Sequence, residues 1–296
     1  MRIARYVHDG KEHYGALHNQ VVVTLPLLAE RLGAKLPPKL EGLIKAGNSC
    51  LETAENVIAR AGNADLEACS CDLDRVSLMA PVEFPPKILL LGLNYVDHVS
   101  ETNKKAPEEP IIFMKPHTTI IGPGQNIIKP SFVTQLDYEG ELAVVIGEKV
   151  KNVSVAEAES CIFGYTILND VSARNFQFKD GQWTRGKSFD TFAPIGPCIT
   201  TKTQLPDTSN LRIRTWVNME LRQNATTRSM SFNVAEIIHH ISRVMTLEPC
   251  DIIATGTPSG VGFAMKPPIF LQDGDVVRIE IEGIGTLENK VLEKKT

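Results

Sequence analysis

Three acidic residues occupy every second position of the segment TQLDYEGELAVVIGEKV. They are Asp137, Glu139 and Glu141, in a stretch whose β-branched residues are typical of a strand. Alternate side chains of a strand leave on the same face, about 7 Å apart. We therefore expect one strand that directs all three carboxylates to one face. Because like charges at a partly buried site raise one another's pKa, the pattern predicts a positive partner beside them. The alternative is a surface strand with a polar outer face.

A further acid, Asp170, ends the apolar strand predicted in GYTILNDVSARNFQ. An acid at the exit of a buried strand is often only a cap. Combined with Glu139 and Glu141, however, Asp170 completes an all-oxygen set that suits a hard divalent cation. Magnesium keeps several waters in its octahedral shell, so three carboxylates leave positions for solvent and substrate. Manganese accepts the same ligands.

Four motifs follow one another in the second part of the chain: LDYEGELAVVIG, GYTILNDVSARNFQ, GKSFDTFAPIGP and GTPSGVG. In this order, from about ILLLGLNY to the C-terminus, they resemble the fumarylacetoacetate hydrolase family. The resemblance implies that Glu139, Glu141 and Asp170 bind Mg²⁺ or Mn²⁺, and that Asp137 lies beside the ligands without binding the metal. It also implies a catalytic domain built as a mixed β-sandwich roll, usually in a homodimer.

The segment GLNYVDHVSE resembles the one that carries the catalytic dyad of the family's acylpyruvase and oxaloacetate decarboxylase branch. His98 and Glu101 are three residues apart, so one helical turn would let the carboxylate orient the imidazole as a general base. Without the resemblance, such a pair is usually a solvated helix face. The preceding glycine and the polar, proline-containing stretch that follows predict a lid over residues 95–108.

The resemblance also implies roles for other polar residues. Lys187 matches a lysine that faces the substrate and could stabilise negative charge on oxygen. Arg174 and Gln177 match positions for substrate or water contacts. Thr257, in ATGTPSGVG, offers a hydroxyl and an amide to a substrate carboxylate. Lys115 lies in another matching stretch. The alternatives are that Lys187 is simply solvated, that Arg174 and Gln177 make structural hydrogen bonds, and that the segment of Thr257 is a turn without a ligand.

Composition narrows the class of protein. The 296 residues carry a net charge of -4, and the basic residues are scattered, so we expect neither nucleic-acid binding nor binding to a membrane surface. No apolar run approaches the roughly 20 residues of a membrane-spanning helix, and the N-terminus lacks a signal peptide's apolar core. We expect a cytoplasmic protein, or an organellar one if a presequence has been removed. The six cysteines lack zinc-site spacing and should be free thiols.

The organisation of the chain changes near residue 76. Before it, residues 1–25 read as strands, and LPLLAERLG, KLEGLIKAG and LETAENVIARAG read as helices. Beyond it, strand-like runs dominate, without the GxGxxG of a dinucleotide site. One helix is predicted among these strands, in NVAEIIHHISRVMTL, with Asn233 as its N-cap. We expect the two histidines of this helix, His239 and His240, to be structural. We predict a small α+β N-terminal domain at 1–75 and a mostly β catalytic domain with some α at 76–296.

These residues predict chemistry on a small 2-oxo acid. Its carboxylate and 2-oxo oxygens would chelate the metal, which favours enolate formation. We expect first the hydrolysis of a C–C bond in an acylpyruvate-like 2,4-dioxo acid, with His98 activating water and Lys187 stabilising the oxyanion. Decarboxylation of oxaloacetate is the second expectation, and hydratase or isomerase chemistry the third. A non-catalytic metabolite-binding protein is the alternative from another class, although such a protein would not need the base His98.

Overall fold

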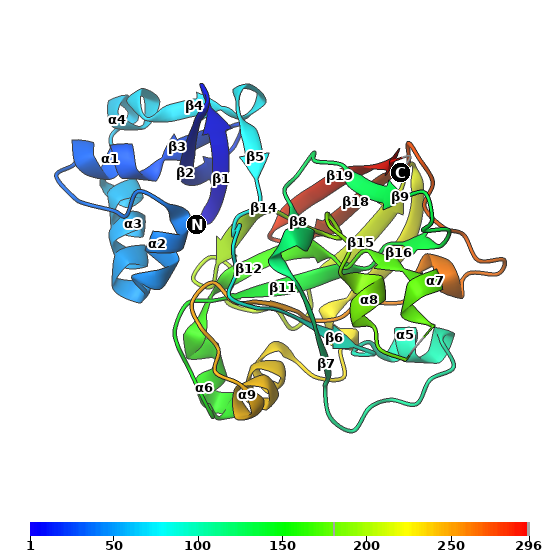
Figure 1. The fold of residues 1–296 in the computed structure, drawn as a ribbon. Helices are drawn as coiled ribbons and strands as arrows, with labels where there is room; N and C mark the ends of the chain where they lie inside the picture. Colours follow the sequence, from blue (N-terminus) through cyan, green and yellow to red (C-terminus); the bar gives the residue numbers. More distant parts are fainter. Residues whose placement is uncertain (180, 295–296) are drawn as a thin grey trace.

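One sheet of twelve strands runs through both parts of the chain in the computed structural model, which describes residues 1–179 and 181–294 (Figure 1). Its main path is, in spatial order, β4 (Ser70–Asp72), β3 (Val21–Thr24), β2 (Lys11–His18), β1 (Arg2–His8), β14 (Ala193–Thr201), β12 (Ile162–Asn169), β11 (Gly140–Ile146), β17 (Ile252–Ala254), β6 (Ile88–Gly92) and β7 (Ile111–Lys115). Two short strands join this path from the side: β5 (Ser77–Met79) pairs with β1, and β8 (Ile120–Ile121) pairs with β14.

The N-terminal part has the predicted order of strands and then helices. A turn at Asp9 and Gly10, with φ of 49° and 73°, joins β1 to β2 as a hairpin. The helices that follow are α1 (Leu25–Arg31), α2 (Leu40–Lys45), α3 (Asn48–Arg60) and α4 (Asn63–Ala68). Since β1 pairs directly with β14, the N-terminal sheet continues into the larger part of the molecule. The division at residue 76 stays a prediction.

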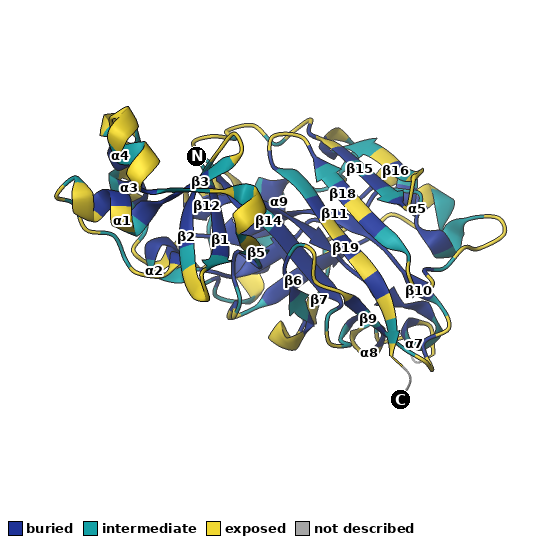
Figure 2. Cartoon of the chain, turned by 90° about the horizontal axis from the view of Figure 1, so that it is seen from above, coloured by how far each residue is buried: buried dark blue, intermediate teal, exposed yellow. Residues whose placement is uncertain are grey.

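A second sheet covers one face of the large sheet. Its order is β16 (Glu220–Thr226), β15 (Arg212–Val217), β18 (Val276–Ile281), β19 (Gly285–Lys294) and β9 (Ile127–Pro130). Along β19 buried and exposed residues alternate, as expected for a strand with one solvent-facing side (Figure 2). The remaining helices are α5 (Val96–Glu101), α6 (Val155–Ala158), α7 (Arg174–Gln177), α8 (Thr184–Lys187) and α9 (Val234–Val244). The 3-10 turns are η1 (Leu73–Arg75), η2 (His117–Thr119), η3 (Glu159–Cys161), η4 (Thr227–Ser229) and η5 (Gly262–Ala264).

Strand β11 lies at the centre and is buried on both faces. Leu142 and Val144 pack into the core shared with the five-stranded sheet and α9. Ala143 and Val145 face a second core, to which α2 and α3 contribute. Burial on both faces explains why this strand is a continuous apolar run rather than an alternating one. The prediction of a mostly β fold with a small α+β N-terminal part is confirmed.

The prediction of a single continuous acidic strand is wrong. Asp137 ends β10 (Leu136–Asp137), which pairs only with β13 (Ser172–Ala173), whereas β11 begins at Gly140. The carboxylate of Asp137 accepts hydrogen bonds from the backbone N–H groups of Gly262 and Phe263, at 2.8 and 3.0 Å, which ties β10 to another loop. A Cβ on Gly140 would lie 2.4 Å from Thr215 Oγ1, so a residue with a side chain would clash at this position.

Several local predictions hold. Asn233 caps α9: its side chain accepts a hydrogen bond from the Glu236 N–H at 3.0 Å, and Glu236 reciprocates at 2.8 Å. On the same helix, His239 hydrogen-bonds to Val153 O and His240 packs against Phe232, which are structural contacts. All six cysteines are free. Among the described residues, no helix has both the length and the apolar character needed to cross a bilayer.

Candidate active site

Glu139, Glu141 and Asp170 meet in the interior. Each offers an oxygen that lies within 4.8 Å of those of the other two. Glu139 immediately precedes β11 and Glu141 lies within it, while Asp170 directly follows the neighbouring strand β12. The antiparallel register pairs Gly140 with Asn169 and so brings Asp170 beside the two glutamates. Their exposed fractions are 6%, 1% and 0%, so the three carboxylates are almost fully removed from water.

Two buried lysines hold this carboxylate cluster. Lys187 Nζ donates to Glu139 Oε2 at 2.7 Å and to Asp170 Oδ2 at 2.5 Å, and Lys115 forms an ion pair with the other oxygen of Asp170. Burial lowers the pKa of Lys115 to about 8, although Asp170 beside it opposes that shift. Burial would raise the pKa of Glu139, but Lys187 and Arg174 outweigh it and hold that pKa well below the ordinary value.

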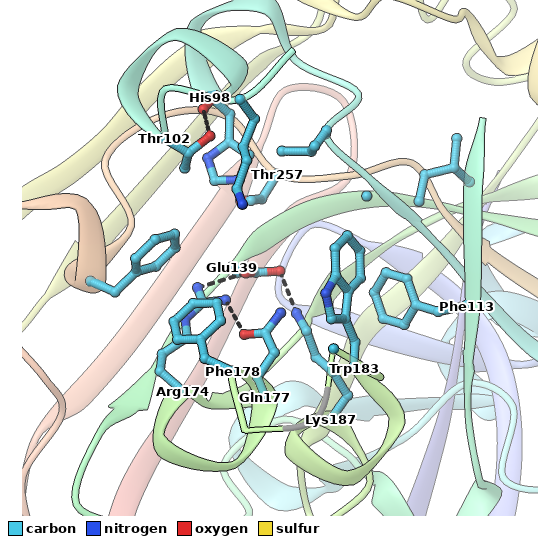
Figure 3. A pocket seen from close by; sticks show the side chains of 16 residues that line it. His98, Thr102, Phe113, Glu139, Arg174, Gln177, Phe178, Trp183, Lys187 and Thr257 are labelled. Carbon is cyan, nitrogen blue, oxygen red and sulfur yellow. Dashed lines mark hydrogen bonds and ion pairs between the residues drawn. The ribbon is translucent and has the colours of Figure 1, made fainter. Parts of the chain in front are cut away.

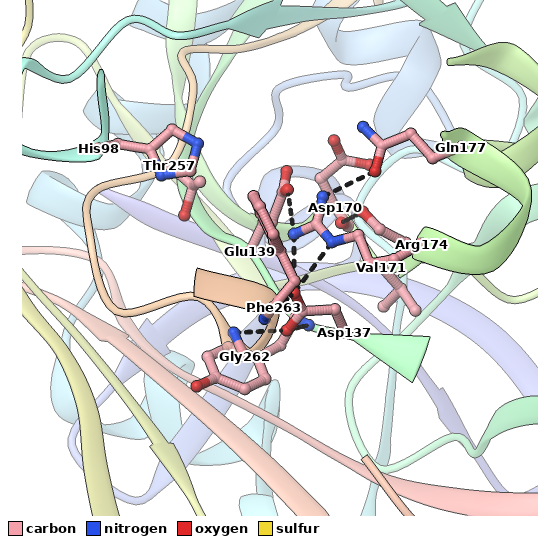
Figure 4. A network of polar contacts seen from close by, with 12 residues as sticks. His98, Asp137, Glu139, Asp170, Val171, Arg174, Gln177, Thr257, Gly262 and Phe263 are labelled. Carbon is pink, nitrogen blue, oxygen red and sulfur yellow. Dashed lines mark hydrogen bonds and ion pairs between the residues drawn. The ribbon is translucent and has the colours of Figure 1, made fainter. Parts of the chain in front are cut away.

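Arg174 joins the cluster to Asp137 (Figure 4). Its guanidinium lies 2.9 Å from Asp137 Oδ2 and 2.6 Å from Glu139 Oε1, and it donates to Gln177 Oε1 at 2.8 Å. Asp137 therefore holds Arg174 and the loop at Gly262 and lies outside the group of three carboxylates, as the resemblance implied. Arg174 and Gln177 thus share a structural hydrogen bond, and their contacts with a substrate stay a prediction.

Glu141 is the member of the cluster without a cationic partner among the described residues. It accepts a hydrogen bond from the Gly256 N–H at 2.7 Å. Burial, together with the nearby charges of Asp170 and Glu139, raises its pKa well above the ordinary value. Within the described residues, this network contains three cations, Lys115, Arg174 and Lys187, and four carboxylates, those of Asp137, Glu139, Glu141 and Asp170. One negative charge is therefore left without compensation. A hard divalent cation would offset that charge, so the donor set fits Mg²⁺ or Mn²⁺.

The predicted pair of His98 and Glu101 lies on α5. His98 Nδ1 is 2.8 Å from Glu101 Oε1, and the other carboxylate oxygen of Glu101 accepts a hydrogen bond from the Gly260 N–H at 2.9 Å. Because an ionised carboxylate can only accept, Nδ1 carries the proton in this hydrogen bond, which leaves Nε2 with a free lone pair. The structure thus presents an oriented imidazole that can take up a proton.

A second carboxylate ties α5 to the loop at Ser259. Asp97 Oδ2 accepts a hydrogen bond from Ser259 Oγ at 2.8 Å, and Asp97 Oδ1 accepts one from the His98 N–H at 3.0 Å. Together with the bond between Glu101 and Gly260, this contact holds α5 against the loop. The predicted lid over residues 95–108 stays a prediction, but these contacts identify what would have to break for it to open.

Replacing Asp97 by alanine should loosen α5. Because both hydrogen bonds that Ser259 donates to the Asp97 carboxylate are lost, together with the one from the His98 N–H, we expect backbone amides of residues 96–101 to exchange about tenfold faster with deuterium. The matched control is Ser100→Ala, since Ser100 Oγ bonds only within the helix, to Val96 O. Unchanged exchange in Asp97→Ala would show that the contact with Ser259 does not hold α5.

A cavity of about 530 Å³ opens onto these groups (Figure 3). The predicted site residues that line it are His98, Glu139, Arg174, Gln177, Lys187 and Thr257. In Figure 3, His98 and Thr257 lie across the cavity from Lys187 and Gln177, with Glu139 between them. Glu101, Glu141 and Asp170 are not in the lining and support the residues that are. A base and a buried cation therefore face one space.

Thr257 offers the cavity only one of its two predicted groups. Its hydroxyl donates to Gly140 O at 3.1 Å and accepts from Gln223 Nε2 at 2.8 Å, so the hydroxyl is already engaged. Within the described part of the chain, no residue accepts a hydrogen bond from the Thr257 N–H. The amide is thus the group that is available to a ligand.

Sequence reasoning missed the aromatic wall of the cavity. Phe113 and Trp183 meet edge to face with their centroids 5.3 Å apart, and Phe178 and Phe263 meet at 5.5 Å. A Cβ on Gly92 would lie 2.3 Å from the Trp183 ring, so this glycine makes room for the indole. These aromatic residues come from separate segments, and no local pattern in the sequence marks them as neighbours.

Comparison with known proteins gives consistent results. Residues 87–292 match the family model described as fumarylacetoacetate (FAA) hydrolase, C-terminal. A Xenopus laevis protein named oxaloacetate tautomerase fahd2, mitochondrial, is 43% identical over 259 residues, which are 87% of this chain and 79% of that protein.

Solved structures are similar over the whole chain. Fumarylacetoacetate hydrolase from Exiguobacterium antarcticum superposes with a TM-score of 0.85 at 37% identity, covering 99% of this chain and 100% of that one. Maleylpyruvate hydrolase from Sphingobium sp. SYK-6, in complex with manganese(II) and pyruvate, superposes with a TM-score of 0.80 at 31% identity, covering 100% of both chains.

Proposed function

Because this chain belongs to the fumarylacetoacetate hydrolase family, we propose that it interconverts the keto and enol forms of a 2-oxo acid of the oxaloacetate type, with the help of a divalent cation. The observation that carries the proposal is His98, which Glu101 orients and which lines the same cavity as Glu139 and Lys187. Tautomerisation needs one group that moves a proton at carbon and another that stabilises charge on oxygen, and the cavity offers both. The name of the Xenopus relative supports this reaction.

Glu139, Glu141 and Asp170 are the residues that would hold the cation. Bound there, Mg²⁺ or Mn²⁺ supplies Lewis-acid polarisation of a 2-oxo group, which makes the neighbouring C3 protons more acidic. The free Thr257 N–H would orient the substrate carboxylate by donating a hydrogen bond to it, and the Gln177 amide at the cavity wall would add a second polar contact.

The proton transfers follow from the hydrogen bonds of α5. His98 Nε2 takes a proton from C3, while Glu101 stabilises the resulting imidazolium through the proton on Nδ1. The Lys187 ammonium offsets negative charge as it develops on the C2 oxygen. Transfer of that proton from His98 to the C2 oxygen gives the enol and leaves His98 neutral again. In the reverse direction, His98 Nε2 takes the proton of the enol hydroxyl and gives it to C3.

Hydrolysis of an acylpyruvate-like substrate is the second candidate. The cavity of about 530 Å³ has room for a longer carbon chain than that of oxaloacetate, and its aromatic wall suits an apolar acyl group. In that reaction His98 would take a proton from the water that attacks C4. Decarboxylation of oxaloacetate would use the same binding mode but takes no proton from carbon, so His98 would act only afterwards, by protonating C3 of the resulting enolate.

A tautomerisation assay tests the first candidate. Protein loaded with Mg²⁺ or Mn²⁺ should accelerate the loss of enol absorbance when enol oxaloacetate is added, chelation should remove the acceleration, and either ion should restore it. Pyruvate release from a series of acylpyruvates is measured in parallel. Pyruvate release without accelerated tautomerisation would contradict the proposal and favour the hydrolase, and full tautomerisation by metal-free protein would contradict the role of the cation.

A further inference from the structure

Lys104 lines the same cavity, and no described residue compensates its charge. The other cations of the lining, Arg174 and Lys187, are both held by buried carboxylates. The Nζ atom of the adjacent Lys105 lies 3.6 Å from Glu108 Oε1, and Lys105 does not line the cavity. Lys104 is therefore the cation that the described cavity wall leaves available to a ligand.

The backbone of Lys104 is held at the end of the helix that carries His98. Asn103 has a φ of 52°, and its N–H donates to Ser100 O at 3.2 Å. The Lys104 N–H donates to Val99 O, also at 3.2 Å. These two bonds around a left-handed residue are the Schellman arrangement that ends many helices. His98, on α5, and Lys104, in the turn that ends α5, therefore both line the cavity. The two hydrogen bonds fix the backbone of Lys104 relative to the helix that carries the general base.

The cavity has different chemistry at different places. Glu139, Lys187 and Arg174 form a polar floor, whereas Phe113 and Trp183 form an apolar wall. A 2-oxo acid bound through its carboxylate and 2-oxo oxygen would occupy the polar floor, and its carbon chain would extend along the wall. Lys104 is an exposed residue of the same cavity wall, and its ammonium, which no described residue pairs, favours an anion over a neutral group on that chain.

We propose that Lys104 binds a second carboxylate of the substrate, and that the enzyme selects dicarboxylic over monocarboxylic 2-oxo acids. The inference rests on the proposed function for the orientation of the substrate. A monocarboxylic 2-oxo acid of the same length leaves Lys104 without a partner. The selection therefore comes from a residue outside the carboxylate cluster, on the element that also supplies the base.

Binding to the manganese-loaded protein tests this inference. The two probes are 2-oxoglutarate and 2-oxopentanoate, which have the same carbon chain and differ in the second carboxylate. We expect the wild-type protein to bind 2-oxoglutarate about tenfold more tightly, as a hydrogen bond to a charged group provides. Lys104→Ala should abolish that preference by weakening 2-oxoglutarate alone, and Lys104→Arg should keep it. Lys105→Ala is the matched control and should bind both ligands as the wild type does.

Three results would overturn the inference: no preference in the wild-type protein, a preference that survives in Lys104→Ala, or equal weakening of both ligands by that substitution. Equal weakening would indicate a general effect of charge on anions rather than contact with a second carboxylate. Since calorimetry measures binding alone, the result does not depend on turnover. A protein that shows the Lys104-dependent preference but does not accelerate tautomerisation would contradict the proposed reaction and leave this inference standing.

Discussion

The affinity of Glu141→Gln for manganese is expected to be about 100-fold or more below that of the wild-type protein. The metal-free variant is expected to be more stable than the metal-free wild-type protein. Loss of a group that only orients a ligand already weakens metal affinity by about 10- to 100-fold, so loss of a direct ligand should cost at least as much. Glutamine keeps an oxygen that can accept the hydrogen bond from the Gly256 N–H. The substitution therefore removes the charge and preserves the contact.

The gain in stability follows from the uncompensated charge. Burial and the neighbouring carboxylates raise the pKa of Glu141 in the folded protein above its unfolded value. A raised pKa means that protonated Glu141 favours the folded state at low pH, and that this contribution is lost as the pH rises through the folded-state pKa. Glutamine has no charge to acquire. The stability advantage of the variant should hence grow as the pH rises from the ordinary glutamate range toward the folded-state pKa of Glu141.

Calorimetric titration with Mn²⁺ and urea unfolding of the metal-free proteins measure the two effects. Glu109→Gln, at an exposed position outside the cavity, is the control and should match the wild type in both. Wild-type manganese affinity in Glu141→Gln would remove Glu141 from the ligand set. A metal-free variant that unfolds at lower urea than the wild type would show that the charge of Glu141 is compensated in a way that the described contacts do not account for.

His98→Ala should lower the rate of tautomerisation by about 10²- to 10⁴-fold, the contribution typical of a positioned general base. Manganese affinity should stay unchanged, because His98 is outside the carboxylate cluster. Glu101→Gln should give a smaller loss in the same direction, since the imidazole remains but its hydrogen bond to an ionised carboxylate at 2.8 Å is gone. Turnover and metal content are measured on each variant.

The control for His98 is His240→Ala, on α9 and outside the cavity, which should retain wild-type turnover. If acylpyruvates are also substrates, their hydrolysis should fall with tautomerisation, because both reactions need the same base. Decarboxylation of oxaloacetate should fall less, since it depends mainly on the cation. Undiminished tautomerisation in His98→Ala would place the base elsewhere and remove the catalytic interpretation of α5.

The parts of the site that could be predicted lie within single elements. His98 and Glu101 are three residues apart, and one turn of α5 brings them into contact as expected. The Asn233 cap of α9 is likewise a contact between residues three positions apart. Such geometry follows from the helical repeat alone, so the sequence determines it. The motifs predict Glu139, Glu141 and Asp170 as metal ligands, and the structure brings their oxygens within 4.8 Å of one another.

The electrostatics of the site depended on tertiary structure. The sequence predicts no partner for Lys115, yet it is buried against Asp170, although β11, β17 and β6 lie between β7 and β12 in the sheet. Among the described residues, tertiary packing gives Glu139 two cationic partners and Glu141 none. Which carboxylate stays uncompensated is decided by contacts among distant segments, and no local spacing encodes it.

The break in the acidic strand and the shape of the cavity have the same origin. Asp137 leaves the line of Glu139 and Glu141 because backbone amides at Gly262 and Phe263 hold its carboxylate, which alternation along one strand does not reveal. The sequence by itself determined the residue types, their local spacing and the family. Only the tertiary structure decided which groups face the cavity, because side chains from separate strands and loops become neighbours only when the sheets pair in one register and pack.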